Sequence, residues 1–335
     1  MEILWSGALG LLLTGYFALA GYDYGVGMLA SRLGRDEAGR RRVLGALGPF
    51  FLGNEVWLVA AVGVLFGAFP HLEGTVLAGG YLLVVTLLLG LVAFTAAVQL
   101  RSRRPDARRG GWDALITGGA LVTTVSWGML IGNLVQGFPL DASGKPDGEL
   151  TSLLSPYALL FGAGFVALLA LHGAVFLTVR GDDTVRKPAR RIALALVPPS
   201  VLFVLIATGW AAVAGVPGST GVSPLIGFGG ALLAVATLLG VRLALRAGRF
   251  RVALAATMLT AALPVLVAGS LRLPTVLVST SEDYRLALDT AAAPPSTLAL
   301  LTTIGGPAIL LVIVVQWLTW RANRHPVGPR TLLHF

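Results

Sequence analysis

The sequence predicts an all-α integral membrane protein with about nine transmembrane helices, with the N-terminus outside and the C-terminus in the cytoplasm. Three observations predict it. The chain of 335 residues is 56% hydrophobic and only 12% charged, with a mean hydropathy of +0.82, whereas a soluble chain carries about 25% charged residues. Nine apolar runs each approach the roughly 20 residues that cross a bilayer. Lys and Arg concentrate in every second gap between these runs.

The nine apolar runs follow one another with short connections, so we expect a single polytopic membrane domain over residues 1–335. A backbone inside a bilayer must satisfy its own hydrogen bonds, which favours helices, and the alternation of a strand barrel is absent. We expect bundles of four helices plus one extra helix. The predicted spans are residues 3–29, 48–69, 75–99, 113–137, 155–179, 192–214, 223–245, 252–271 and 297–320.

The basic residues predict the orientation. All but Lys145, Arg272 and Arg285 of the 25 Lys and Arg residues fall at the ends of spans one, three, five, seven and nine. Cytoplasmic loops of membrane proteins carry an excess of Lys and Arg, so these ends are predicted to be cytoplasmic. The formal charge of +9 is therefore expected to meet anionic lipid headgroups, and nucleic acid is not an expected partner.

Several kinds of chemistry are excluded or disfavoured. The chain has no cysteine, which excludes disulfide bonds, thiolate metal sites and cysteine nucleophiles. The nucleophile-elbow, phosphate-loop and zinc-helix motifs are absent. His172 is the one histidine clearly inside a predicted span, and a haem held by two histidines needs a second at matching depth. We expect His172 to pack or to form a hydrogen bond, and we expect Gln316, near a cytoplasmic helix end, to be wetted.

Two carboxyl groups fall at membrane depth, where a charged side chain costs on the order of 3 kcal/mol. Asp23 lies roughly 9 Å from the cytoplasmic end of span one at about 1.5 Å per residue, and Glu55 lies at a similar depth in span two. With Asn54 they are predicted to form a polar pocket that faces the cytoplasm. On chemistry alone two interpretations stay open: proton handling, or a buried hydrogen-bonded pair that fastens the first two helices.

A series of short motifs carries the most specific signal. Residues 21–28 read GYDYGVGM, residues 53–58 read GNEVWL and residues 65–70 read LFGAFP. Further along come GN at 132–133, PYALL at 156–160 and HGA at 172–174. This series resembles subunit II of the cytochrome bd-type quinol oxidases. The resemblance covers the whole chain and is most specific before Arg180.

The resemblance implies a haem-free subunit II of a quinol:O2 oxidoreductase in the bacterial cytoplasmic membrane. It implies a haem-bearing subunit I as partner, with two b haems and haem d in that partner and no cofactor bound by this chain. A structural quinone and small single-span accessory subunits are compatible with it, and quinol and O2 reach the complex. In some members subunit II contributes to a cytoplasmic proton path, for which Asp23, Asn54 and Glu55 are the candidates here. Trp57 is a candidate for the subunit contact or for packing.

The chain also departs from the pattern of that family. Phe51-Leu52 stands where the family usually has Trp-Asp, and leucine cannot relay a proton. Three interpretations therefore stay open: a path through Asp23 and Glu55, proton entry through subunit I alone, or a divergent paralogue. A secondary transporter with buried carboxyl groups is the alternative function. A purely structural role in assembly is a special case of the oxidase hypothesis.

Overall fold

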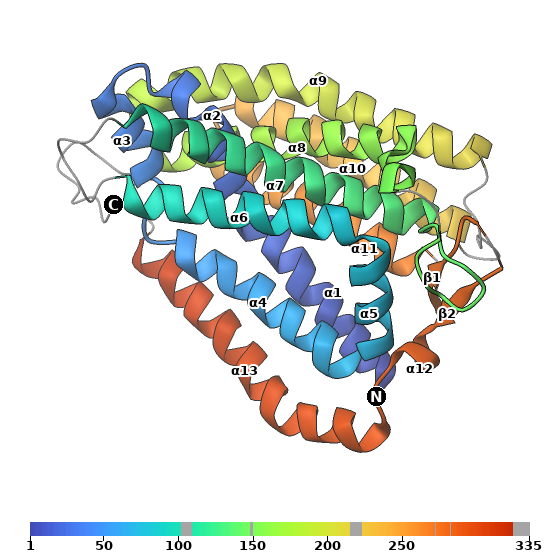
Figure 1. Ribbon diagram of the computed structural model, residues 1–335. Helices are drawn as coiled ribbons and strands as arrows, with labels where there is room; N and C mark the ends of the chain where they lie inside the picture. Colours follow the sequence, from blue (N-terminus) through green and yellow to red (C-terminus); the bar gives the residue numbers. More distant parts are fainter. Residues whose placement is uncertain (102–108, 148–149, 215–222, 272, 282, 324–335) are drawn as a thin grey trace.

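A computed structural model of the chain describes residues 1–101, 109–147, 150–214, 223–271, 273–281 and 283–323. In this described part, nine helical segments are long and apolar enough to cross a membrane, as the sequence predicts. The segments lie side by side. The N-terminus and the end of the last helix lie at opposite ends of the molecule (Figure 1).

The first span is built from two consecutive helices, α1 (Glu2–Leu19) and α2 (Gly21–Leu33), which are separated by a turn at Ala20. Each of the other spans is a single helix. These are α4 (Phe51–Ala68), α6 (Tyr81–Leu100), α7 (Gly110–Gln136), α8 (Pro156–Arg180), α9 (Asp183–Ala214), α10 (Ser223–Arg246), α11 (Phe250–Ser270) and α13 (Pro295–Ala322).

The helices pack as two groups of four with one helix outside them. In the second group α8 packs on α9, α9 on α10, α10 on α11, and α11 returns to α8. In the first group α1 packs on α4, α2 on α7 and α7 on α6, while side-chain contacts join α4 to α6. The last helix, α13, packs mainly on α4 and lies at the edge of the molecule (Figure 1).

The two groups of helices meet where two glycines let the backbones of α2 and α8 approach closely. A Cβ on Gly25 would lie 2.0 Å from the carbonyl oxygen of Leu169, and a Cβ on Gly173 would lie 2.3 Å from the carbonyl carbon of Gly25. No other residue fits at either position without moving a helix, which is the usual role of small residues between membrane helices. The contact fixes the depth of α2, and with it Asp23, against α8.

Most predicted span boundaries lie within a few residues of the helix ends in the structure, and two differ by more. The third span was expected from residue 75, but α5 (Pro70–Gly79) is a separate helix and α6 begins at Tyr81. The chain turns at Gly80, where a Cβ would lie 2.9 Å from the carbonyl oxygen of Val76. The sixth span was expected from residue 192, but α9 begins at Asp183. Hydropathy locates the apolar part of a helix, whereas turn chemistry locates its ends.

The long connections at one end of the bundle form a small cap that the sequence did not predict. The strands β1 (Thr275–Val278) and β2 (Arg285–Ala287) pair antiparallel, and Phe138, after α7, bridges to Ser279. The backbone N–H of Leu140 donates to Ser279 Oγ at 3.1 Å. The short helices η1 (Leu150–Leu154) and α12 (Leu288–Ala291) belong to the same connections.

At the opposite end, a network of ion pairs ties α3 (Glu37–Gly45) to α6 and α7. Arg101 is 2% exposed; its Nε donates to Asp113 Oδ1 at 2.5 Å and its Nη2 to Glu37 Oε2 at 2.9 Å. Arg40 pairs with Asp113 at 2.9 Å, and Arg109 pairs with Glu37. Partial burial acts to raise the pKa of Glu37, but the two arginines outweigh it and hold this pKa below its ordinary value.

Candidate functional site

The centre of the candidate site is the buried side chain of Asn54, on the first turn of α4. Its Nδ2 lies 2.9 Å from Asp23 Oδ2, 2.9 Å from the hydroxyl of Tyr22 and 3.3 Å from the carbonyl oxygen of Leu19. Asn54 is fully buried and Asp23 is 1% exposed. The turn at Ala20 presents this stretch of α2 to α4. The amide therefore joins the first two spans.

Gln316 of α13 completes this cluster, and its position corrects a prediction. We expected Gln316 to be wetted, but it is only 7% exposed and its Nε2 donates to Asn54 Oδ1 at 2.9 Å. A polar side chain on a helix that is otherwise apolar is buried most easily against another polar group. Asn54 thus connects Asp23 on the first span with Gln316 on the last. We call these three residues, with Tyr22, the amide cluster.

Glu55 is turned away from the amide cluster, toward α6. Thr95 Oγ1 donates to Glu55 Oε1 at 2.5 Å, and the Glu55 side chain is partly exposed in the seam between α4 and α6. Consecutive residues of an α-helix point about 100° apart, since a turn holds about 3.6 residues. The structure therefore brings Asp23 and Asn54 together directly, and it places Glu55 on an adjoining face of the same helix.

Trp57 packs inside this chain. It is 6% exposed, and its indole lies against Gly15 of α1, where a Cβ would come within 2.1 Å of Trp57 Cε3. Of the two roles that the sequence left open for Trp57, contact with a partner or packing, this geometry corresponds to packing between α1 and α4.

The first span also carries a second polar cluster, which was not predicted from the sequence. The hydroxyls of Tyr16 and Tyr24 lie 2.6 Å apart, and Trp127 Nε1 of α7 donates to Tyr16 at 3.2 Å. All three side chains are buried. The spacing from Tyr16 to Tyr24 places both rings on one face of the span, which is the signal that would have identified the pair.

The described residues do not suit a haem. His172 is the one histidine in the spans that the structure describes, and both of its ring nitrogens are occupied. Nε2 donates to the carbonyl oxygen of Ala18 at 3.1 Å, and Nδ1 is hydrogen-bonded to Thr257 Oγ1 at 2.8 Å. Within the same residues no group of three or more His, Asp or Glu side chains is arranged to hold a metal ion. Hydrogen bonding is one of the two roles, with packing, that the sequence predicted for His172.

These features define a polytopic membrane protein whose buried polar site holds carboxyl and amide groups. The family model described as cytochrome bd terminal oxidase subunit II matches residues 1–323. The chain belongs to this family.

Individual relatives agree with this assignment. The chain is 32% identical over 204 residues to a protein of Bacillus subtilis named cytochrome bd ubiquinol oxidase subunit 2, a match that covers 61% of this chain and 60% of the relative. It is 33% identical over 204 residues to cytochrome bd-I ubiquinol oxidase subunit 2 of Escherichia coli K12, covering 59% of this chain and 54% of that protein. The aligned segments thus span less than two thirds of these relatives.

A solved structure shares the fold over nearly the full chain. The structure of bd oxidase from Geobacillus thermodenitrificans superposes with a TM-score of 0.74, covering 96% of this chain and 98% of that one at 18% identity. At this identity the similarity concerns the fold alone, which is the nine-span arrangement that the sequence predicted.

Proposed function

We propose that the chain is the haem-free subunit II of a quinol:O2 oxidoreductase in the bacterial cytoplasmic membrane, where it scaffolds a haem-bearing subunit I. The observation that carries the proposal is the family match over residues 1–323. The two b haems and haem d then belong to the partner, in keeping with the fully hydrogen-bonded His172. A structural quinone and small accessory subunits remain compatible with this assignment.

The seam between α4 and α6 is the surface that we assign to subunit I. Glu55 is partly exposed there, on a helix whose outer face carries the exposed side chains of Leu52 and Val59, at 55% and 69%. A carboxyl group in contact with lipid hydrocarbon is costly, so membrane carboxyl groups usually face protein or water. A partner that covers this seam would remove Glu55 from lipid. Leu52, which stands where the family usually has Asp, would lie on the same surface.

The same geometry supports a proton route through this subunit. Asp23 Oδ1 receives no hydrogen bond from the described residues, so this oxygen is available to hold a proton. Glu55 lies on the adjoining face of α4, toward the proposed partner. In this route protons from the cytoplasm pass by Asp23 and Glu55 to the oxygen site of subunit I. The competing role is structural, in which the amide cluster only fastens the first, second and last spans.

A spectrum tests the assignment. The complex is purified through an affinity tag on this chain, and its reduced-minus-oxidised optical spectrum is recorded. Bands of haem b and haem d that copurify with the chain support the oxidase. A pure, folded chain without haem would refute it, and substrate-dependent flux in liposomes that contain this chain alone would establish the transporter alternative.

Two conservative variants test the proton route in the assembled oxidase. Asp23→Asn and Glu55→Gln keep the size of each side chain and remove its proton-carrying group. Loss of a positioned proton-transfer group typically slows a reaction by about 10²-fold or more, so oxygen consumption should fall while the haem spectrum is unchanged. Glu73→Gln, on the short helix α5, is the matched control. Full turnover in both variants would favour the structural role.

The proposed orientation can be tested directly because the native chain has no cysteine. Ser143→Cys places a thiol in the connection after α7, and Ala247→Cys places one in the turn between α10 and α11. With the N-terminus outside, an impermeant maleimide should label only the first variant in intact cells and both after lysis. The reverse labelling would invert the proposed topology.

A further inference from the structure

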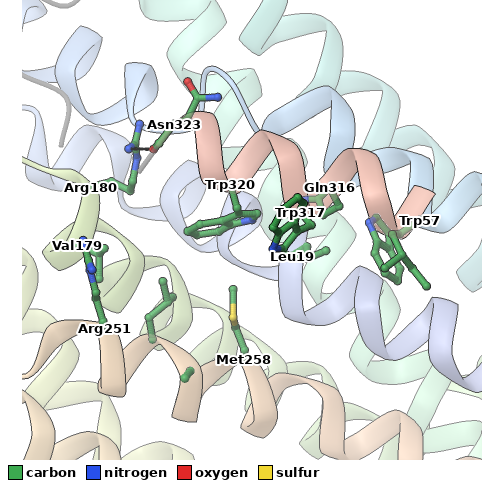
Figure 2. Close-up of a pocket in the computed structure, with 13 residues that line it drawn as sticks. Leu19, Trp57, Val179, Arg180, Arg251, Met258, Gln316, Trp317, Trp320 and Asn323 are labelled. Carbon is green, nitrogen blue, oxygen red and sulfur yellow. Dashed lines mark hydrogen bonds between the residues drawn. The ribbon is translucent and has the colours of Figure 1, made fainter. Parts of the chain in front are cut away.

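An open cleft of about 540 Å³ separates the last helix, α13, from α8 and α11. Figure 2 shows its lining residues. Its wall is largely apolar and aromatic, with Trp317 and Trp320 from α13 and Met258 from α11. Pockets of roughly 300–1,000 Å³ hold small ligands in proteins. We propose that this cleft binds one anionic phospholipid, with its phosphate at Arg180 and Arg251 and an acyl chain along the tryptophans.

Two arginines define one end of the cleft. Arg180 ends α8, and Arg251 stands on the first turn of α11. Figure 2 shows both at the same end as Asn323, with Trp57 at the opposite end. Because this end coincides with the helix termini that carry the excess of basic residues, it lies at the depth of lipid headgroups. Basic pockets between membrane helices on the cytoplasmic side are recognised binding sites for anionic headgroups.

The structure holds Arg180 in place and leaves Arg251 open to a ligand. Arg180 is 4% exposed; it donates to the carbonyl oxygen of Asn323 and lies 5.1 Å from the ring centre of Phe50. Arg251 is exposed and makes no salt bridge with any residue that the structure describes. The fold thus holds Arg180 in position, and the exposed side chain of Arg251 can move to bind a phosphate. Arginine suits this role, because its planar guanidinium binds phosphate oxygens in pairs.

The rest of the cleft wall is apolar. Leu254 and Met258 of α11 face Ile313, Trp317 and Trp320 of α13 across it. Two cations at one end and an apolar wall along the remainder match an amphiphile with an anionic head.

A phospholipid bound in the cleft would also affect the amide cluster. Gln316 contributes to the cleft wall and also donates to Asn54 at 2.9 Å. Outside the cleft, α13 packs mainly on α4. A lipid that fills the cleft therefore links α13 to the second group of helices and holds Gln316 against Asn54. This inference does not depend on the proposed oxidase activity.

The test measures lipid binding to the full-length chain, purified with whatever subunits accompany it and then delipidated in detergent. Dioleoyl-phosphatidylglycerol and dioleoyl-phosphatidylcholine are added in turn, and bound lipid is counted by native mass spectrometry. Arg251→Gln removes the exposed cation of the cleft. Arg249→Gln is the matched control, since it removes an exposed charge two residues away that does not line the cleft. Ala255→Trp fills the cleft and keeps both arginines.

We expect one phosphatidylglycerol to bind in preference to phosphatidylcholine. A basic residue near a membrane surface contributes about 1 kcal/mol toward an anionic lipid, so Arg251→Gln should weaken this binding about fivefold. Arg249→Gln should leave it unchanged, and Ala255→Trp should abolish it. Equal binding of the two lipids, equal losses in the two arginine variants, or unchanged binding in Ala255→Trp would overturn the proposal. Recovery of a neutral quinone from the cleft, lost in Ala255→Trp, would overturn it as well.

Discussion

Replacement of Asn54 by leucine should lower the stability of the folded chain by about 2 kcal/mol. The amide Nδ2 carries two hydrogens that are shared among the acceptors on Asp23, Tyr22 and Leu19, and Asn54 Oδ1 accepts one hydrogen bond from Gln316. The side chain therefore takes part in about three hydrogen bonds at once. Hydrogen bonds between membrane helices average about 0.6 kcal/mol each. Leucine has a similar size, so little of the effect should come from a cavity.

The assay is equilibrium unfolding of the purified chain in mixed micelles of a mild detergent and dodecyl sulfate, followed by tryptophan fluorescence. Gln99→Leu is the control, because Gln99 has no hydrogen-bond partner among the described residues and lies partly exposed on α6. Its free energy of unfolding should stay within about 0.5 kcal/mol of the native value.

A double-mutant cycle isolates the contact between the second and last spans. Asn54→Leu and Gln316→Leu are measured singly and together. Since the two side chains share a hydrogen bond of 2.9 Å, their effects should be non-additive by about 0.6 kcal/mol, with about 1.7 kcal/mol as an upper value. Strictly additive effects, or an Asn54→Leu variant as stable as Gln99→Leu, would refute the reasoning.

Three further predictions concern packing and charge. Gly25→Ala should destabilise the fold by about 1–3 kcal/mol, since its Cβ would lie 2.0 Å from a backbone oxygen of α8. Gly240→Ala, with nothing within 4 Å, should be neutral or slightly stabilising in the same equilibrium unfolding assay. Arg101→Met should be destabilising by about 1–3 kcal/mol, because it removes the buried guanidinium that binds the buried Asp113 and the partly exposed Glu37. The exposed ion pair of Asp183 and Arg186 should contribute less than about 1 kcal/mol when Asp183→Asn is measured. The lowered pKa of Glu37 predicts a contribution to stability that is present above the ordinary value near 4.5 and is lost as the pH falls through the lower, folded-state pKa. Unfolding midpoints measured from pH 6 down to about pH 3 should therefore fall less steeply in Glu37→Gln than in the native chain; parallel pH profiles would contradict this assignment.

Much of the fold follows from the sequence, because the nine spans are long apolar runs and a bilayer leaves a chain few alternatives to helices. The depths of Asp23 and Glu55 in the first two spans predict a cluster of these two residues with Asn54. In the structure Asn54 is hydrogen-bonded to Asp23, whereas Glu55 is hydrogen-bonded to Thr95. The direction of Glu55 could have been read from helical geometry, since it follows Asn54 and must point to another face. These predictions depend on one helix or on two consecutive helices.

The contacts that escaped prediction join distant parts of the chain. Gln316 meets Asn54 across most of the sequence, and nothing in an apolar run indicates which face of which helix it will pack against. The break at Gly80 and the early start of α9 depend on turn chemistry that hydropathy does not register. The cap around Ser279 is stabilised by backbone pairing between two connections, which composition alone does not reveal.

The hydrogen bond between Asn54 and Gln316 has a consequence for synthesis of the chain. Residue 54 enters the membrane early, whereas residue 316 belongs to the last span to be made. Until α13 arrives, the oxygen of Asn54 lacks its donor, because Gln316 supplies it. The amide cluster therefore forms only after α13 has entered the membrane. A product truncated before α13 keeps both four-helix groups and carries an unfinished polar site, which distinguishes it from the finished subunit before any partner binds.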